Sequence, residues 1–385
     1  MASPNQSAGR SNSGLTKLLA VLVAAQFASI AGIFTPYVFA QPDRTGLRIF
    51  ALIICGLALF TLASVWLDKP WAIWATLTLV SFKLTIDLFT WTVPLNHLLI
   101  LLSVIINAAM ILIAFTHMSP LGPSVTASKK VFFGCVLVLA AWVGYWGLFA
   151  PAQVDIALPF KVPPLHARFL GAMYLSGAIV LFLSMFARIW PEVRGFVPMI
   201  SIWTGMLGII SVFHLAAFNW SRTQVWVWFF AYICFPIIAA WIAWRQRSQQ
   251  EHAPGSPMSR AFRGYLYLQG GVDTLLGLSL LIAPTAMTAL WPWKISPVLA
   301  HMYSAPFLSY GLGTLYAARQ QTWPEVRLVV YLTLTFALLV LVGSSLHQQL
   351  FKFGTASAWL WFGGFGLAAL ILALFTSIPA LRREK

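Results

Sequence analysis

The chain has 385 residues, of which 60% are hydrophobic and only 9% are charged. A soluble domain carries about 25% charged residues, so this composition excludes an ordinary soluble protein. Lys and Arg number 24 against 9 acidic residues, but the basic residues are scattered over the loops and form no run of five. Such scattered charge is typical of loops that face anionic lipid, and it argues against nucleic acid as a partner.

Apolar stretches of about 20 residues, the length that crosses a bilayer core, recur along almost the whole chain. We therefore predict an all-α, polytopic integral membrane protein with about 12 transmembrane helices. The expected spans are residues 16–38, 47–67, 71–92, 94–117, 130–150, 166–187, 192–218, 222–245, 262–283, 297–318, 324–348 and 356–379. Residues 1–14 are rich in Ser, Asn and Gly, and we expect them to be a disordered N-terminus.

An even number of spans places both termini on the same side of the membrane. With that side taken as inner, the inner segments hold more Lys and Arg than the outer ones. The positive-inside rule then predicts a cell-membrane protein whose N-terminus and C-terminal tail, residues 382–385, are both cytoplasmic.

The sequence contains an internal repeat. Residues 148–229 align without a gap on residues 281–362, a shift of 133 positions (281 minus 148). The two segments share a WPEVR pentapeptide at 190–194 and 323–327, together with Pro, Lys, His and Trp residues in register. A shared pentapeptide in register with these residues does not arise from apolar composition alone.

We infer three copies of a four-helix unit, the first of them a weaker match. The copies are residues 15–118, 129–247 and 260–381, joined by linkers at 119–128 and 248–259. Because four helices return the chain to its starting side, the copies are parallel, and three parallel copies suggest a pseudo-threefold arrangement.

WPEVR begins a helix at the cytoplasmic face in both stronger copies. Pro fits the first helical turn, and an acidic residue there suits the positive helix end. The motif is therefore expected to start the helix and anchor it in the headgroup layer. The alternative is a cytoplasmic gate built from ion pairs among Glu192, Arg194, Glu325 and Arg327.

Five of the seven histidines fall at the outer face in this topology: His97, His166, His214, His301 and His347. A ring of imidazoles can bind a metal, ligate a haem or sense pH. However, no HxH, HExxH or CxxC spacing accompanies them, so no metal or cofactor is predicted. Hydrogen bonding to a neighbouring repeat is the simpler interpretation.

The outer segments 151–164 and 284–297 are rich in Pro and aromatic residues. The sequences LPFK at 158–161 and WPWK at 291–294 are expected to lie in the membrane interface, with their aromatic rings among the headgroups. They can serve as anchors or as a lid over an outward cavity.

Three charged residues fall inside predicted spans, where a charge is costly and often functional. Lys83 and Asp87 are four residues apart, so they can pair on one helix face. Asp273 follows two glycines that permit a close helix approach. None of the three recurs in the other copies, which fits either a specialised role or drift with a neutralising partner.

The function that best fits these features is a transporter or permease of a small apolar or anionic solute, with Asp273 as the coupling group. The alternative is a non-catalytic scaffold, an accessory subunit of a larger membrane complex, or a lipid- or pigment-binding module. The scarcity of polar residues in the spans favours the alternative. An enzyme is not expected, because no catalytic motif occurs and the carboxylates outside the spans are isolated. Expected partners are the bilayer itself, anionic lipids at the cytoplasmic face and partner membrane subunits.

Overall fold

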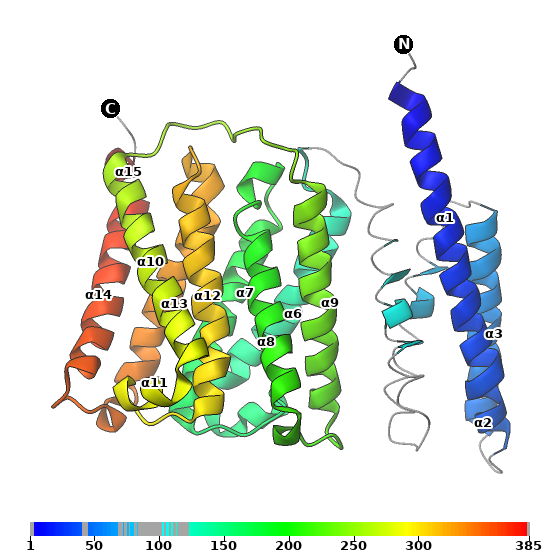
Figure 1. Ribbon diagram of the computed structural model, residues 1–385, viewed down its shortest axis with the longest axis horizontal. Helices are drawn as coiled ribbons and strands as arrows, with labels where there is room; N and C mark the ends of the chain where they lie inside the picture. Colours follow the sequence, from blue (N-terminus) through cyan, green and yellow to red (C-terminus); the bar gives the residue numbers. More distant parts are fainter. Residues whose placement is uncertain are drawn as a thin grey trace. The chain divides into compact units, whose positions relative to one another are not determined.

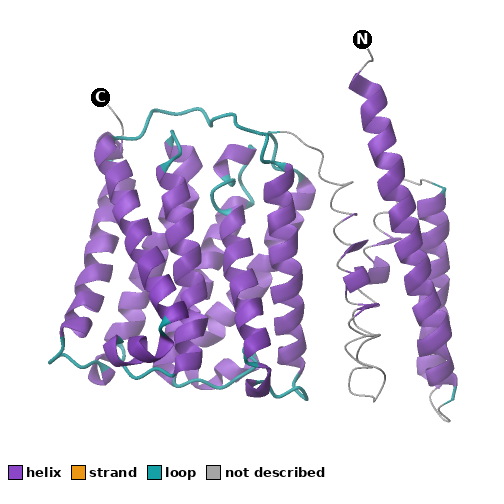
Figure 2. Cartoon of the chain, in the orientation of Figure 1, coloured by secondary structure: helices purple, strands orange, loops and turns teal. Residues whose placement is uncertain are grey.

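The computed structural model describes residues 4–40, 45–67 and 123–382, together with isolated positions between residues 72 and 113. These residues are largely helical, and two isolated β-bridges are the only strand-like pairings among them (Figure 2). The chain divides into two compact units, Met1–Pro120 and Leu121–Lys385.

In the first unit, α1 (Pro4–Ser29) continues through the π-turn η1 (Ile30–Phe34) into α2 (Thr35–Phe39). The π-turn lies just before Pro36, which cannot donate a backbone hydrogen bond. The Ile30 carbonyl accepts the backbone N–H of Thr35 and, at 2.9 Å, the Thr35 hydroxyl as well. Since α1 begins at Pro4, it includes most of the segment that composition predicts to be disordered.

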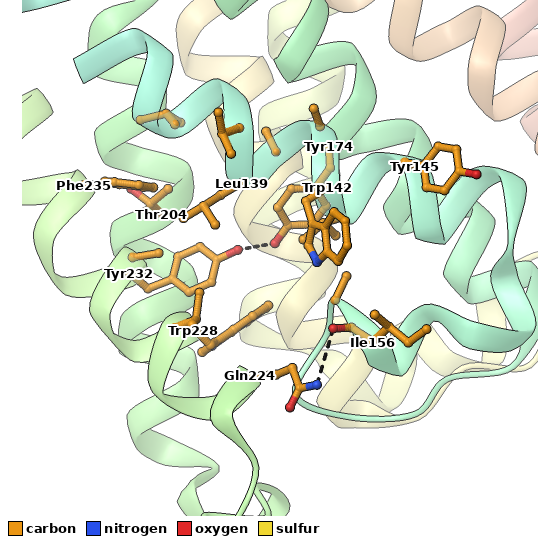
Figure 3. A pocket seen from close by; sticks show the side chains of 18 of the residues that line it. Leu139, Trp142, Tyr145, Ile156, Tyr174, Thr204, Gln224, Trp228, Tyr232 and Phe235 are labelled. Atoms are coloured by element: carbon orange, nitrogen blue, oxygen red, sulfur yellow. Dashed lines mark hydrogen bonds between the residues drawn. The ribbon is translucent and has the colours of Figure 1, made fainter. Parts of the chain in front are cut away.

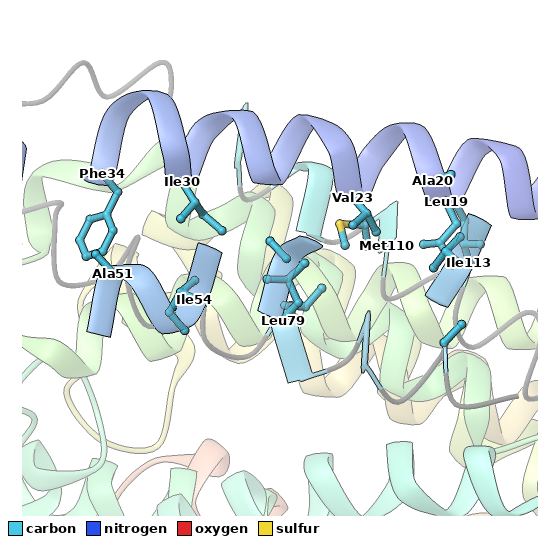
Figure 4. Close-up of a cluster of buried hydrophobic side chains, with 14 of the residues drawn as sticks. Leu19, Ala20, Val23, Ile30, Phe34, Ala51, Ile54, Leu79, Met110 and Ile113 are labelled. Atoms are coloured by element: carbon cyan, nitrogen blue, oxygen red, sulfur yellow. The ribbon is translucent and has the colours of Figure 1, made fainter. Parts of the chain in front are cut away.

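The core of the first unit lies between α1 and α3 (Thr45–Trp66) (Figure 4). Val23 and Ile54 are fully buried in it, as are Leu79 and Met110. The expected spans 71–92 and 94–117 therefore contribute side chains to this core, although most of their residues lie outside the described part of the chain.

The second unit is a bundle of long, roughly parallel helices (Figure 1). They are α6 (Ala127–Phe149), α7 (Pro164–Ser184), α8 (Val197–Phe213), α9 (Thr223–Arg245), α10 (Arg260–Ile282), α12 (Pro297–Ala318), α13 (Trp323–Ser345) and α14 (Ala356–Ser377). Short helices connect them: η2 (Pro151–Ile156), η3 (Trp190–Glu192), η4 (Leu215–Ala217), α11 (Pro284–Leu290) and η5 (Gln348–Leu350), with α15 (Pro379–Arg382) at the end.

Six of the described helices are long and apolar enough to cross a membrane: α6, α7, α9, α10, α13 and α14. The protein is therefore a helical membrane protein, as its composition predicts. Apart from α8, the long helices of the second unit, seven in number, begin and end close to the expected spans. Helix α8 is shorter than the expected 192–218 because η3 and η4 occupy its two ends. The total of twelve spans stays a prediction.

Glycines bring neighbouring helices into close contact at corresponding places. A Cβ atom added to Gly144 of α6 would lie 2.9 Å from the backbone nitrogen of Leu175 in α7, and one added to Gly277 of α10 would lie 2.7 Å from that of Leu308 in α12. Small residues allow such backbone approach between membrane helices. The pairs α6/α7 and α10/α12 therefore depend on these glycines for their tight packing.

The middle of the bundle is formed by four helices, which contact each other in two pairs. Helix α7 packs on α13, and α8 packs on α12. The end of the bundle that carries residues 246–259 (top of Figure 1) is called the linker face below.

Candidate functional site

A cavity of about 850 Å³ lies between α6 and α9, with walls from α7 and α8 (Figure 3). Its size falls within the range of about 300–1,000 Å³ that is usual for small-molecule sites. It is lined by Val136, Val138, Leu139, Ala140, Ala141, Trp142, Val143, Tyr145, Ile156, Ala157, Tyr174, Thr204, Thr223, Gln224, Val227, Trp228, Ala231, Tyr232 and Phe235. None of these side chains is charged.

The cavity exists because α6 and α9 pack on different neighbours. Helix α6 packs chiefly on α7, and α9 packs chiefly on α8. At the α8/α9 contact, a Cβ atom added to Gly208 would lie 2.6 Å from the Tyr232 carbonyl oxygen, so these two backbones are as close as helices allow. Helix α6 is thus held to α7 and helix α9 to α8, and a space is left between α6 and α9.

Hydrogen-bonding groups in the cavity wall are largely occupied by other protein groups. The hydroxyls of Tyr174 and Tyr232 bond to each other in the depth of the cavity (Figure 3). The Thr204 hydroxyl donates to the Ile200 carbonyl at 2.6 Å, and the Trp228 indole donates to the Ser211 hydroxyl at 2.9 Å. With its polar groups satisfied in this way, the wall suits an apolar occupant rather than a hydrated one.

A polar contact lies at the end of the cavity near η2. The Gln224 side-chain amide donates to the Ile156 carbonyl at 3.4 Å (Figure 3). Gln224 is partly exposed, so this end offers the few polar groups that an amphipathic molecule requires for its head.

Of the three charged residues predicted inside the spans, the two that the structure describes, Lys83 and Asp273, are not among the residues that line this cavity. In the first unit, Lys83 is 3% exposed and donates to the Ser103 hydroxyl at 2.8 Å. Gln26 completes this cluster, donating from its amide nitrogen to the Ser103 carbonyl at 3.1 Å. Asp87 lies outside the described residues, so its pairing with Lys83 stays a prediction.

Asp273 lies on α10, away from the cavity, and hydrogen-bonds to the Gln269 side chain one turn earlier. Its carboxylate is also close enough to Tyr310 of α12 to interact electrostatically. The Tyr310 hydroxyl in turn lies 3.1 Å from the Ser176 hydroxyl of α7. Tyr310 and Ser176 thus make a polar contact between α12 and α7, and Asp273 of α10 acts on Tyr310 electrostatically.

Four of the five predicted outer histidines lie in the second unit, and each contacts another helix. His166 Nδ1 lies 2.8 Å from the Tyr303 hydroxyl, and His214 Nε2 lies 3.2 Å from His301 Nδ1. His347 Nε2 hydrogen-bonds to the Arg168 guanidinium. His97 lies outside the described residues. Among the described residues, no group of three or more His, Cys, Asp or Glu side chains is placed to hold a metal ion.

The four charged residues of the WPEVR motifs meet in two cross-connected pairs at the linker face. Arg194 Nη2 lies 2.6 Å from Glu325 Oε1, and Arg327 Nη2 lies 3.0 Å from Glu192 Oε1. Glu325 also caps its own helix, because its side chain accepts from the backbone of Thr322, whose side chain caps the first turn in return. The motif therefore starts α13 and joins the two halves of the bundle, while a gating role stays a prediction.

Two tryptophans of the second aromatic outer segment are buried within the protein, whereas the sequence predicts them to lie among lipid headgroups. Trp291 and Trp293 are only 3% and 2% exposed. They pack inside the bundle against Phe169, Tyr303 and Trp361. Burial among other rings gives these side chains more apolar contact than the headgroup layer offers, so the WPWK expectation was wrong for its tryptophans.

The sequence analysis also missed the cavity and the Tyr174 and Tyr232 pair within it. Both tyrosines read as ordinary aromatic residues of apolar spans, and no spacing in the sequence marks the separation of α6 from α9. The chain matches no known family model, no curated protein and no solved structure.

Proposed function

We propose that this membrane protein binds an apolar or weakly amphipathic molecule of the bilayer, such as a lipid chain or a pigment, in the cavity between α6 and α9. The observation that supports this is the cavity itself: about 850 Å³ of space at the depth of two membrane helices, with an uncharged wall. A hydrated solute requires polar lining groups that this wall does not supply.

Photolabelling of the purified full chain in lipid nanodiscs tests this function. The probe is a fatty acid that carries a diazirine near the end of its chain, and labelled peptides are mapped by mass spectrometry. The expected result is labelling concentrated on the α6 and α9 residues that face the cavity. Equal labelling of the exposed lipid-facing residues of α14 would contradict the proposal.

A cavity-filling variant sharpens this test. Val227 lines the cavity on α9, and the position 133 residues later is Leu360, which is 74% exposed on α14. Val227→Trp is expected to reduce labelling of the cavity by about ten-fold, because a bulky ring occupies space needed by an acyl chain. Leu360→Trp is the matched control and should leave cavity labelling unchanged.

We further propose that α6–α9 and α10–α14 are two copies of one unit, related by a pseudo-twofold axis. Both bounds of α6 fall on those of α10 after a shift of 133 residues (260 minus 127 and 282 minus 149). The same shift exchanges the two pairs Arg194/Glu325 and Arg327/Glu192, and likewise Arg168/His347 and His301/His214.

Exchanged contacts of this kind are the property of a two-fold interface. A closed ring of three requires head-to-tail contacts instead. For these two copies we therefore replace the pseudo-threefold arrangement suggested by the sequence with a two-fold one. Residues 15–118 stay a predicted third copy.

Coupled transport is the second candidate function, and one observation favours it. Asp273, which acts electrostatically on Tyr310, is a protonatable group within the span α10. Infrared difference spectra between acid and neutral pH test it. A protonated-carboxyl band that disappears in Asp273→Asn is expected if this residue takes up protons. A spectrum identical in both proteins would remove Asp273 from any coupling role.

A further inference from the structure

A second cavity, of about 420 Å³, opens at the linker face, and its wall is polar. It lies where the end of α9, the segment 246–259, the start of the α8 region and the end of α12 meet. Three arginines line it, Arg194, Arg247 and Arg319, together with His252 and four glutamines. No acidic side chain belongs to this wall.

Arg194 forms the base of the linker-face cavity and is only 8% exposed. Its guanidinium donates to the Glu251 carbonyl at 3.0 Å and to the Glu325 carboxylate at 2.6 Å. The negative charge of Glu325 therefore neutralises the positive charge of Arg194. The Nε group of Arg194 is buried and has no hydrogen-bond partner within the described part of the chain.

The other two arginines add positive charge at the rim of the cavity without a partnering carboxylate. Arg247 is held by its own helix end, stacking on the Trp244 ring at 4.3 Å and donating to the Trp244 carbonyl at 3.0 Å. Arg319 is exposed, and its side chain makes no hydrogen bond or ion pair with the residues that the structure describes. The nearby Glu251 side chain is exposed and lies outside the wall.

These polar groups are present on one side of the bundle only. Under the pseudo-twofold relation proposed above, Tyr316, Arg319 and Gln320 correspond to Leu183, Phe186 and Ala187 (each 133 residues earlier). The four-helix unit thus folds with apolar residues at these positions. Arg319 and Gln320 are not required by the repeated architecture, although the cavity itself does not depend on that relation.

We propose that the linker-face cavity binds a phosphoryl group, supplied either by the headgroup of an anionic lipid or by a free phosphate. Guanidinium groups bind phosphate oxygens through paired, charge-assisted hydrogen bonds. Arg247 and Arg319 supply two uncompensated positive charges, enough to balance a free phosphate dianion or the single negative charge of a phosphodiester headgroup, and the glutamine amides add neutral donors. Arg194, which also lines the cavity, has one N–H group, at Nε, that is without a hydrogen-bond partner among the described residues.

Binding measurements on the purified full chain in a neutral detergent test this site. Three probes are titrated by microscale thermophoresis: dihexanoyl phosphatidylglycerol, inorganic phosphate and, as a zwitterionic reference, dihexanoyl phosphatidylcholine. Binding of phosphatidylglycerol alone identifies a lipid headgroup as the source, and comparable binding of inorganic phosphate identifies a free phosphate. Either result supports the site if it depends on the arginines.

Arg319→Gln is the main variant, because this exposed side chain makes no contact that folding requires. It is expected to weaken binding of the anionic probe by at least about ten-fold. Arg247→Gln should do the same, and Arg188→Gln, an exposed arginine on the same face outside the cavity, should change it less than two-fold. Anionic-probe binding that is equal in wild type, Arg319→Gln and Arg247→Gln, or absent in wild type, would overturn the proposal.

Discussion

Arg194 and Glu325 form a short ion pair between the two halves of the bundle, with 2.6 Å between Nη2 and Oε1 and side chains 8% and 0% exposed. The exchanged pair, Arg327 and Glu192, is longer at 3.0 Å and far more open, at 36% and 16% exposed. Two copies of one motif thus make the same contact in different surroundings.

This difference predicts unequal effects of removing each carboxylate. Glu325→Gln leaves Arg194 buried without a counter-charge and is expected to lower the free energy of unfolding by about 3–5 kcal/mol. Glu192→Gln, the matched change, should cost at most about 1 kcal/mol because water solvates Arg327. Unfolding of both variants in mixed detergent micelles measures this. Equal decreases in the free energy of unfolding would contradict the deeper burial of the Arg194 and Glu325 pair.

The glycines at the helix contacts provide a second prediction. Gly144→Ala and Gly277→Ala place a Cβ atom 2.9 Å and 2.7 Å from backbone atoms of the facing helix. Each is expected to lower the melting temperature, with a cost of about 1–3 kcal/mol from overpacking. Gly134→Ala is the control, since its nearest neighbour, Met185 Cε, is 4.0 Å away and alanine favours the helix. A control as damaging as the two test variants would refute the close approach.

Two equivalent tryptophan contacts test the repeat at the level of single hydrogen bonds. The Trp228 indole donates to Ser211 at 2.9 Å, and the Trp361 indole donates to Ser344 at 3.0 Å, in both cases buried. Ser211→Ala and Ser344→Ala are each expected to cost about 1 kcal/mol, because each leaves a buried N–H unpaired. Thermal denaturation of both variants compares the losses. A loss in one variant and none in the other would show that the two contacts are not equivalent.

The contact between His347 and Arg168 makes stability depend on pH. Burial, and then the positive charge of Arg168, lower the pKa of His347 below its ordinary value of 6.5. The unfolded state therefore binds the proton more readily, so stability is unaffected well above pH 6.5 and falls as the pH drops below it. Wild type should lose melting temperature between pH 7.5 and pH 5, and His347→Gln should lose less. Identical losses of melting temperature in wild type and His347→Gln would contradict this linkage. Lys352→Gln, a change at a nearby exposed residue, is the control and should behave as wild type.

Much of the fold of the second unit could be predicted from the sequence. Hydropathy gave the bounds of α10 and α14 closely because each helix must carry enough apolar residues to cross the membrane. The Pro and acidic residues of WPEVR gave the start of α13, since the capping box of Thr322 and Glu325 is a local property.

The arrangement of those helices was not predictable in the same way. Trp291 and Trp293 carry the same composition signal whether they lie among headgroups or inside the bundle, and only the rings of Phe169 and Trp361 decide between the two. The cavity depends on which helix α6 and α9 each pack against, and the apolar periodicity of the sequence does not determine that packing. The linker-face cavity depends on the path of residues 246–259, which have no helical pattern to read.

The most direct test of the proposed function is a density map of the full chain in lipid nanodiscs by electron cryomicroscopy. The account predicts elongated, non-protein density between α6 and α9, ending near the Tyr174 and Tyr232 hydroxyls, and its loss in Val227→Trp. Helices α6 and α9 in direct contact, with no space between them, would contradict it.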